Sequence, residues 1–198
     1  MRGMTIAALA VLAMLGGAPR AHASETYAID QRFGDIAFKV SHLGLFSSAG
    51  KFRRFTGSVT IDEAHPRNTR ISVVIDTGSV AMSWQAAADM LRSPPYFDVG
   101  RYPDARFTST RVTPQGSAGY EIDGMLELRG ITQPVELHAT LRDRHKGAVP
   151  GQEIADFVVT GVLRRSAFGM KADRTFVSDK VHLRIDARVR LDPPGHDG

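Results

Sequence analysis

The chain of 198 residues contains no cysteine. Disulfide bridges, a thiolate nucleophile and cysteine-ligated metal clusters are therefore excluded, and the folded state must depend on its core. The seven histidines never recur two or four residues apart, so the sequence predicts no metal site. It also contains no phosphate-binding loop and no serine-hydrolase motif, so we predict no catalytic residues and a protein that is not an enzyme.

Long apolar runs are absent except near the N-terminus. There, Arg2 precedes a short apolar run over residues 6–15, and Ala21-His22-Ala23 is a small-x-small cleavage signal. Ten residues make about 15 Å of helix, roughly half of what a bilayer core requires. We therefore expect residues 1–23 to be a secretory signal peptide that is cleaved after Ala23, leaving a soluble, periplasmic protein.

Charge gives no indication of nucleic-acid binding. Removing a leader that holds Arg2 and Arg20 lowers the basic count from 25 to 23 against 21 acidic residues, a net charge of +2. The charges alternate in sign along the chain and form no basic stripe. We expect no nucleic-acid partner.

Apolar and polar residues alternate with a period of two over most of the chain. The last such segment is the longest, with Val181, Leu183 and Ile185 in one phase and His182, Arg184 and Asp186 in the other. Such alternation is typical of strands with one buried face and one wet face. Turn-forming clusters separate roughly eight to ten such segments. The sequence therefore predicts an all-β fold of antiparallel strands.

One segment has a helical pattern instead. Residues 83–92 are rich in helix formers, with Ser83 as a candidate N-cap and Pro94 as a stop. Trp84, Ala88 and Leu91 share one predicted face. We expect a short helix that acts as a lid over a barrel of about eight strands, because long strands with wet faces would otherwise leave exposed sheet edges. The predicted domain is 24–191, and 192–198 is a disordered tail.

Several motifs resemble one known family in order and spacing. They are Tyr27–Asp30, Phe38–Gly44, Gly50–Gly57, Leu91–Asp98, Gly124–Thr132, Arg165–Met170 and Ser178–Leu183. Over residues 27–191 the chain resembles the YceI-like lipid- or polyisoprenoid-binding proteins, which are periplasmic and have a lipocalin-like barrel. It departs from the family pattern at Phe33-Gly34, Met90 and Ala167, where polar residues are usual. Each departure removes a polar group with which the family could contact the head group of a ligand.

The resemblance implies a non-catalytic carrier that holds an isoprenoid quinone or a polyprenyl lipid in an apolar tunnel, with no required cofactor. The residues expected to line that tunnel are Phe38, Val40, Leu45, Phe46, Phe52, Phe55, Met82, Trp84, Leu91, Tyr96, Phe97, Phe107, Phe168 and Met170. The polar candidates for its head group are His42, Arg53, Arg54 and Arg92, since imidazole can hydrogen-bond a quinone carbonyl and guanidinium can bind a phosphate.

Three alternatives stay open at this point. An outer-membrane barrel also alternates, although aromatic residues make up only 8% of the chain and form no girdles. An enzyme of the cyclase or isomerase type would need an acid–base pair inside the barrel. A stress-related interaction protein would have a filled barrel. We expect contact with a membrane surface to be transient, and the sequence leaves open whether the protein is a homodimer.

Overall fold

The computed structural model describes residues 25–61 and 66–191. The predicted leader and the predicted disordered tail lie outside the described residues. The strands are β1 (Glu25–Ala28), β2 (Asp35–His42), β3 (Phe46–Phe52), β4 (Phe55–Ile61), β5 (Arg70–Asp76), β6 (Val80–Met82), β7 (Asp104–Gln115), β8 (Gly119–Leu128), β9 (Ile131–Lys146), β10 (Glu153–Arg164) and β11 (Val177–Leu191). The helical elements are α1 (Gln85–Arg92) and the 3₁₀ turns η1 (Gln31–Phe33), η2 (Pro66–Asn68), η3 (Thr77–Ser79) and η4 (Arg165–Phe168).

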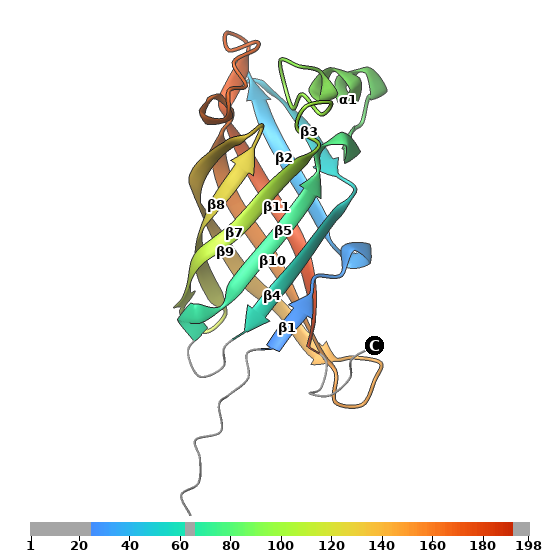
Figure 1. Ribbon diagram of the computed structural model, residues 1–198, viewed down its shortest axis with the longest axis vertical. Coiled ribbons are helices and arrows are strands. Elements are labelled where there is room, and N and C mark those ends of the chain that lie inside the picture. Colours follow the sequence, from blue (N-terminus) through green and yellow to red (C-terminus); the bar gives the residue numbers. More distant parts are fainter. Residues whose placement is uncertain (1–24, 62–65, 192–198) are drawn as a thin grey trace, which may run out of the picture.

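The strands form one curled antiparallel sheet in the order β1-β4-β5-β7-β8-β9-β10-β11-β2-β3-β6 (Figure 1). Only two residues separate β3 from β4, although these strands lie near opposite ends of that order. The passage from β3 to β4 therefore brings the two ends of the sheet together as a barrel. Two further interruptions, by η1 and η3, divide β1 from β2 and β5 from β6. Counting each interrupted strand once gives the eight strands that the sequence predicted.

Two short capping interactions explain interruptions in the long strands. The Asp30 side chain accepts a hydrogen bond from the Arg32 backbone N–H and starts η1. The Asp76 side chain accepts one from the Ser79 backbone N–H and starts η3. An aspartate that bonds the backbone two or three residues ahead turns the chain out of the extended conformation.

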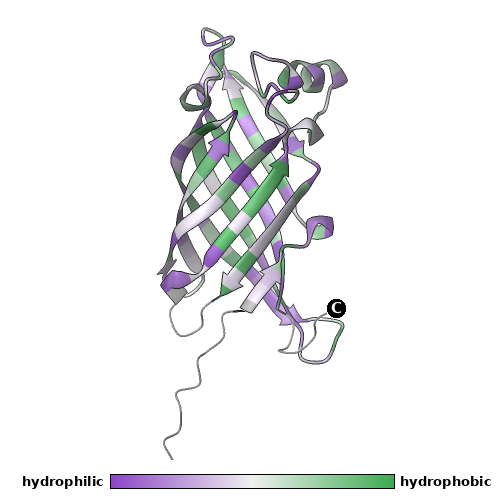
Figure 2. Cartoon of the chain, in the orientation of Figure 1, coloured by the Kyte–Doolittle hydropathy of each residue, from purple (hydrophilic) through white to green (hydrophobic). Residues whose placement is uncertain are grey.

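The predicted alternation is confirmed by burial. On β7, Ala105, Phe107 and Ser109 are buried, whereas the residues between them are exposed. Figure 2 shows apolar and polar residues interspersed along the strands. Since the ladder is antiparallel and closed, the inward face of every strand meets the others across the barrel.

The helix is shorter than predicted and begins without a side-chain cap. α1 starts at Gln85, and its N-cap residue is Trp84, which is extended (φ −126°, ψ 124°) and makes no side-chain capping bond. The prediction that Ser83 caps the helix is therefore wrong; this helix end is exposed, so water can satisfy its free N–H groups. Because Trp84 precedes the helix, it does not follow the helical phase and is 70% exposed, while Ala88 is buried.

Candidate ligand-binding cavity

A cavity of about 470 Å³ runs along the interior of the barrel. At one end its wall contains Leu91, Tyr96 and Phe97, which belong to α1 and the segment after it. We call this the α1 end; the β2–β3 hairpin and the loop from η4 to β11 also lie there (Figure 1). At the opposite end the wall contains Ile61 and Leu141, so inward side chains line the cavity along the length of the strands.

Glycines on the inward face let large side chains lie against the wall. A Cβ atom at Gly124 would lie 2.4 Å from the Phe107 ring, and one at Gly161 would lie 2.5 Å from the Leu137 side chain. A residue with a side chain at either position would push its neighbour toward the barrel axis. These glycines therefore help to keep the centre of the barrel open.

An aromatic cluster lies in the barrel near the α1 end. The Phe38, Phe52 and Phe97 rings have centroids 5.4 to 6.4 Å apart, with tilted or edge contacts. Such contacts stabilise the cluster beyond the burial of its area. The cluster joins β2 and β3 to the segment after α1 and so fixes the α1 end of the cavity.

Arg165 is the buried charged group of the cavity wall. Its side chain donates hydrogen bonds to the backbone carbonyls of Met170, Ala172, Val177 and Ser178, at distances from 2.6 to 3.4 Å, and Arg165 is only 6% exposed. Among the described residues, no carboxylate forms an ion pair with it. A buried cation that is balanced only by carbonyl dipoles retains a positive potential toward the cavity.

Two loops meet over the α1 end. The Tyr96 hydroxyl, in the segment after α1, donates a hydrogen bond to the Asp173 carboxylate, in the loop after η4. Burial, followed by this hydrogen bond, raises the pKa of Tyr96 to about 12. Arg129 also donates to the backbone carbonyls of Pro94 and Tyr96. These contacts form a clasp across this end of the cavity.

The opposite end of the cavity carries a second arginine. The β9–β10 register shifts between Asp156 and Phe157, which leaves Arg142 as an extra residue in β9. A bulge of this kind reverses the facing of the residues beyond it. Arg144 therefore lies in the inward phase at the edge of the cavity, where it is exposed and forms an ion pair with Glu153 (Nε to Oε2, 2.7 Å).

Most of the residues predicted to line a tunnel are on the cavity wall. They are Phe38, Val40, Phe52, Phe55, Leu91, Tyr96, Phe97, Phe107, Phe168 and Met170. Four are elsewhere. Met82 packs against the core cluster, and Leu45, Phe46 and Trp84 are 70 to 78% exposed. Leu45 and Phe46 lie at the tip of the β2–β3 hairpin, beyond the barrel wall, which explains why the alternation does not bury them.

The predicted head-group residues lie outside the cavity wall. Arg92 donates to the carbonyls of Gly78 and Val80 and pairs with Asp89, so it ties α1 to β6. The other three are His42, which hydrogen-bonds Ser48 (2.8 Å), Arg54, which pairs with Asp76, and the exposed Arg53.

Arg165 is the polar residue that these predictions missed, although the sequence contained a signal for it. It continues the inward phase of Phe157, Val159 and Leu163 along β10. The family departures fall elsewhere: Met90 is exposed, Ala167 packs against the core, and Phe33 lies under the Arg188 guanidinium at 4.4 Å. These side chains do not line the described cavity, so the departures leave its wall unchanged.

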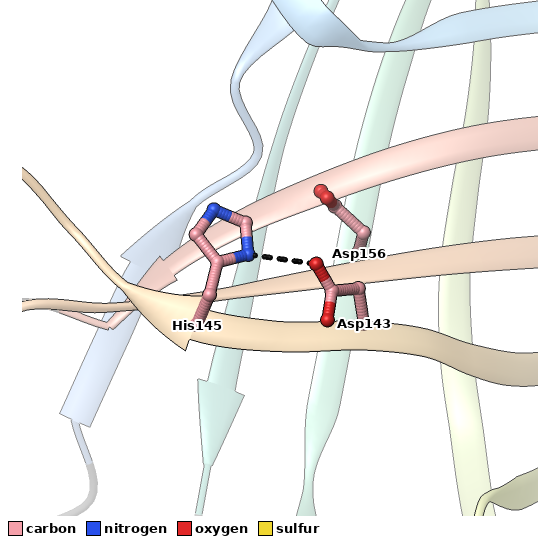
Figure 3. A group of neighbouring side chains, drawn as sticks. All are labelled: Asp143, His145 and Asp156. Atoms are coloured by element: carbon pink, nitrogen blue, oxygen red, sulfur yellow. Dashed lines mark hydrogen bonds and ion pairs between the residues drawn. The ribbon is translucent and has the colours of Figure 1, made fainter.

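A cluster of titratable residues lies on the outside of the barrel (Figure 3). Potential ligand atoms of Asp143, His145 and Asp156 lie within 4.8 Å of one another. Arg188, however, donates to both Asp156 oxygens (2.7 and 2.8 Å), and this hydrogen bonding lowers the Asp156 pKa. The cluster is thus an ion-pair network, and we assign no ligand to it.

The fold and the cavity define a single-domain antiparallel β-barrel with an internal apolar binding space. Within the described ranges, no helix is long and apolar enough to cross a membrane. The model of the YceI-like domain matches residues 27–189, and the chain belongs to this family.

A relative agrees with that assignment, and two solved structures agree with the fold. A UPF0312 protein of Yersinia enterocolitica is 35% identical over 181 residues, which cover 90% of this chain and 93% of that one. The crystal structure of Burkholderia cenocepacia BcnA superposes with a TM-score of 0.72 at 22% identity, over 81% of this chain and 98% of that one. A polyisoprenoid binding domain from Saccharophagus degradans, implicated in plant cell wall breakdown, gives a TM-score of 0.60 at 15% identity, over 84% of this chain and 98% of that domain.

Proposed function

We propose that this protein is a periplasmic carrier that binds a long isoprenoid lipid, a quinone or a polyprenyl lipid, inside the barrel. The observation that carries the proposal is the apolar cavity of about 470 Å³ along the barrel axis. Its volume falls within the range of about 300–1,000 Å³ that is usual for small-molecule sites. The polyisoprenoid binding domain that shares the fold adds support.

The length of the barrel suits a lipid tail. β10 has 12 residues, and at about 3.3 Å per residue and a tilt of about 40° it spans roughly 30 Å along the axis. A bilayer core is also about 30 Å thick. A chain that reaches across one leaflet or more would therefore fit lengthwise between the two ends of the cavity.

Tail burial alone does not select a ligand. Each apolar carbon gains about 0.8 kcal/mol on leaving water, but a lipid tail in a membrane has already gained that energy. Selectivity must then come from the cavity shape and from polar contacts at its ends. We propose that Arg165, at the α1 end, meets the polar group of the ligand through the one guanidinium N–H that its four bonds to backbone carbonyls leave over, because guanidinium bonds carbonyl and phosphate oxygens well.

The proposed role is binding without chemistry. Catalysis on an apolar substrate would need an acid–base pair with perturbed pKa values in the cavity. Tyr96 lies on the cavity wall, but burial and its hydrogen bond to Asp173 raise its pKa to about 12, so the phenol keeps its proton and is a poor acid–base group. The open interior also disagrees with the alternative of a filled barrel.

The test is native mass spectrometry of the protein purified without detergent from its host, followed by loading with a prenyl quinone. Ala139 is an inward residue of the cavity wall, and the neighbouring Thr140 points outward. We expect bound lipid in the wild type and in Thr140→Trp, and none in Ala139→Trp. Absence of co-purified lipid together with failure to load the wild type would refute binding. Osmotic-shock fractionation tests the periplasmic location, and retention in the cytoplasm would refute it.

A further inference from the structure

Six large apolar side chains are exposed together at the α1 end. We call them the apolar rim: Leu43, Leu45, Phe46, Trp84, Met90 and Phe176, which are between 48 and 78% exposed. They come from the β2–β3 hairpin, from α1 with the residue before it, and from the loop after η4. Figure 1 places these three segments at the same end of the barrel. The Leu43 backbone N–H donates to the Phe176 carbonyl (3.1 Å), so two of the segments are in contact.

The segments that carry the apolar rim also carry residues of the cavity wall. Each rim segment, or the strand that leads into it, also contributes an inward apolar residue: Val40 precedes the hairpin, Leu91 belongs to α1, and Val177 follows Phe176. Each segment therefore carries an exposed apolar residue and a cavity-lining apolar residue at the same end of the barrel. A lipid that enters at this end would meet apolar side chains both outside the barrel and on the cavity wall.

The opposite end of the barrel has a different surface. Elsewhere in the described chain, the large apolar residues of comparable exposure come singly from separate elements: Val149 at the opposite end (42%), Phe33 of η1 (56%), with the Arg188 guanidinium over its ring, and Val162 of β10 (51%). Contiguous exposed apolar surface is uncommon on soluble proteins and marks interaction sites. The asymmetry indicates that one end of the barrel, and not its whole surface, meets an apolar partner.

The charges beside the rim are positive. Lys171 and Arg174 are exposed on the loop after η4 and form no ion pair with any described residue. Asp89 pairs with Arg92. Asp173 accepts a hydrogen bond from the neutral Tyr96 hydroxyl and keeps its charge, so Lys171, Asp173 and Arg174 give the loop after η4 a net charge of +1. Basic side chains next to apolar ones suit a membrane surface with anionic head groups.

We propose that the apolar rim docks the α1 end onto a phospholipid bilayer that contains anionic lipid; this inference rests on the proposed lipid-binding function. A second copy of the chain is the competing occupant. In a two-fold dimer through the rim, however, the same patch would face itself. Lys171 and Arg174 would then approach their own copies, whereas an anionic bilayer neutralises them.

Trp84 provides a direct measurement, because it is the only tryptophan of the chain and is 70% exposed in the rim. The purified protein is mixed with vesicles of phosphatidylcholine and phosphatidylglycerol, and the emission of Trp84 is recorded with excitation at long wavelength. We expect a blue shift, reduced quenching by acrylamide, and flotation of the protein with the vesicles. Tryptophan favours the membrane interface, where such changes arise.

Paired variants separate rim contact from general stickiness. Replacing Phe46 with Ser removes a rim ring, and we expect the vesicle affinity to fall about tenfold. Val149→Ser, at the opposite end, is the matched control and leaves the affinity unchanged. The double variant Lys171→Gln and Arg174→Gln weakens binding to anionic vesicles and leaves binding to pure phosphatidylcholine unaltered.

Three results would overturn docking. The first is no shift of Trp84 emission and no flotation with either kind of vesicle, and the second is an equal loss of vesicle affinity in Phe46→Ser and Val149→Ser. The third is a blue shift that appears when the protein is concentrated without vesicles and that accompanies a dimer in light scattering. Loading with a prenyl quinone from dilute solution separates this inference from the proposed function. If Phe46→Ser loads normally but does not float, docking and binding are distinct; if the wild type does not load, the binding proposal fails by itself.

Discussion

Replacing Ala139 with Leu distinguishes an open barrel from a filled one by the sign of the stability change. Ala139 lies on β9 opposite Tyr120 and Val159, with its methyl group on the cavity wall. Leu adds three carbons, and at about 0.8 kcal/mol for each buried carbon the gain is at most about 2.4 kcal/mol. Incomplete packing reduces this, so we expect the lipid-free variant to be more stable than the wild type by about 1–2 kcal/mol.

The same substitution would have the opposite effect in a packed core, where an extra group of this size costs about 1–3 kcal/mol. Thermal unfolding of delipidated protein measures the difference, and for a domain of this size 1 kcal/mol corresponds to about 2–4 °C. The control Thr140→Leu changes the outward face of the same strand and is expected to shift stability by less than about 0.5 kcal/mol. A lower melting temperature for Ala139→Leu than for wild type would refute the reasoning. Stability and lipid uptake should change in opposite directions, because the added side chain occupies the ligand's space.

Three further predictions concern the ends of the barrel. Tyr96→Phe removes the clasp hydrogen bond, so a loaded prenyl quinone should exchange faster, measured by transfer to acceptor vesicles, while the fold is retained. Hydrogen bonds from Arg32 and Arg190 lower the pKa of the Asp30 carboxylate below its unfolded value. The contribution of this carboxylate to stability is therefore complete above the unfolded pKa of about 3.9 and is lost as the pH falls through the lower folded pKa. Melting temperatures of wild type and Asp30→Asn should therefore differ at pH 6 and converge in strong acid; a constant difference would contradict this. Arg92→Ala, which removes two bonds to backbone carbonyls, should increase amide exchange in α1, and unchanged exchange there would show that these bonds do not hold the helix.

Most of the fold follows from sequence because each strand carries its own two-residue period. The alternation in β11 and β9 defines an inward face without any knowledge of the partner strands. The sequence does not predict the interruptions at Asp30 and Asp76, since an aspartate that follows an apolar strand residue is also compatible with a continuous wet face. Alternation also fails beyond the β9 bulge, where one extra residue turns Arg144 inward.

The candidate site was harder to predict because exposure depends on where a strand ends. Phe46 is apolar and in a strand, but it lies at the tip of the β2–β3 hairpin, beyond the barrel wall. In the sequence, Trp84 fits the apolar spacing of a helix over residues 83–92, but α1 begins at Gln85, so the Trp84 side chain does not join its buried face. Conversely, the sequence suggests that Arg92 is available to a ligand, but in the fold its guanidinium group donates hydrogen bonds to two backbone carbonyls. Extending the inward phase of β10 one residue past its end, to the first residue of η4, identifies Arg165.

The exposed apolar residues predicted for the tunnel and the buried arginine that the sequence analysis missed together sharpen the functional argument. Aromatic and aliphatic side chains that were expected inside the tunnel are outside it, at one end, and a buried arginine is inside the cavity at that same end. For a protein that only stores a lipid, exposed apolar side chains at the cavity end would lower solubility without benefit. For a protein that exchanges its lipid with a bilayer, they shorten the aqueous gap that the tail must cross, and Arg165 offers a bonding partner to the polar group once it arrives. Exchange at the α1 end accounts for both features, and it requires that rim variants slow transfer from vesicles more than loading from dilute solution.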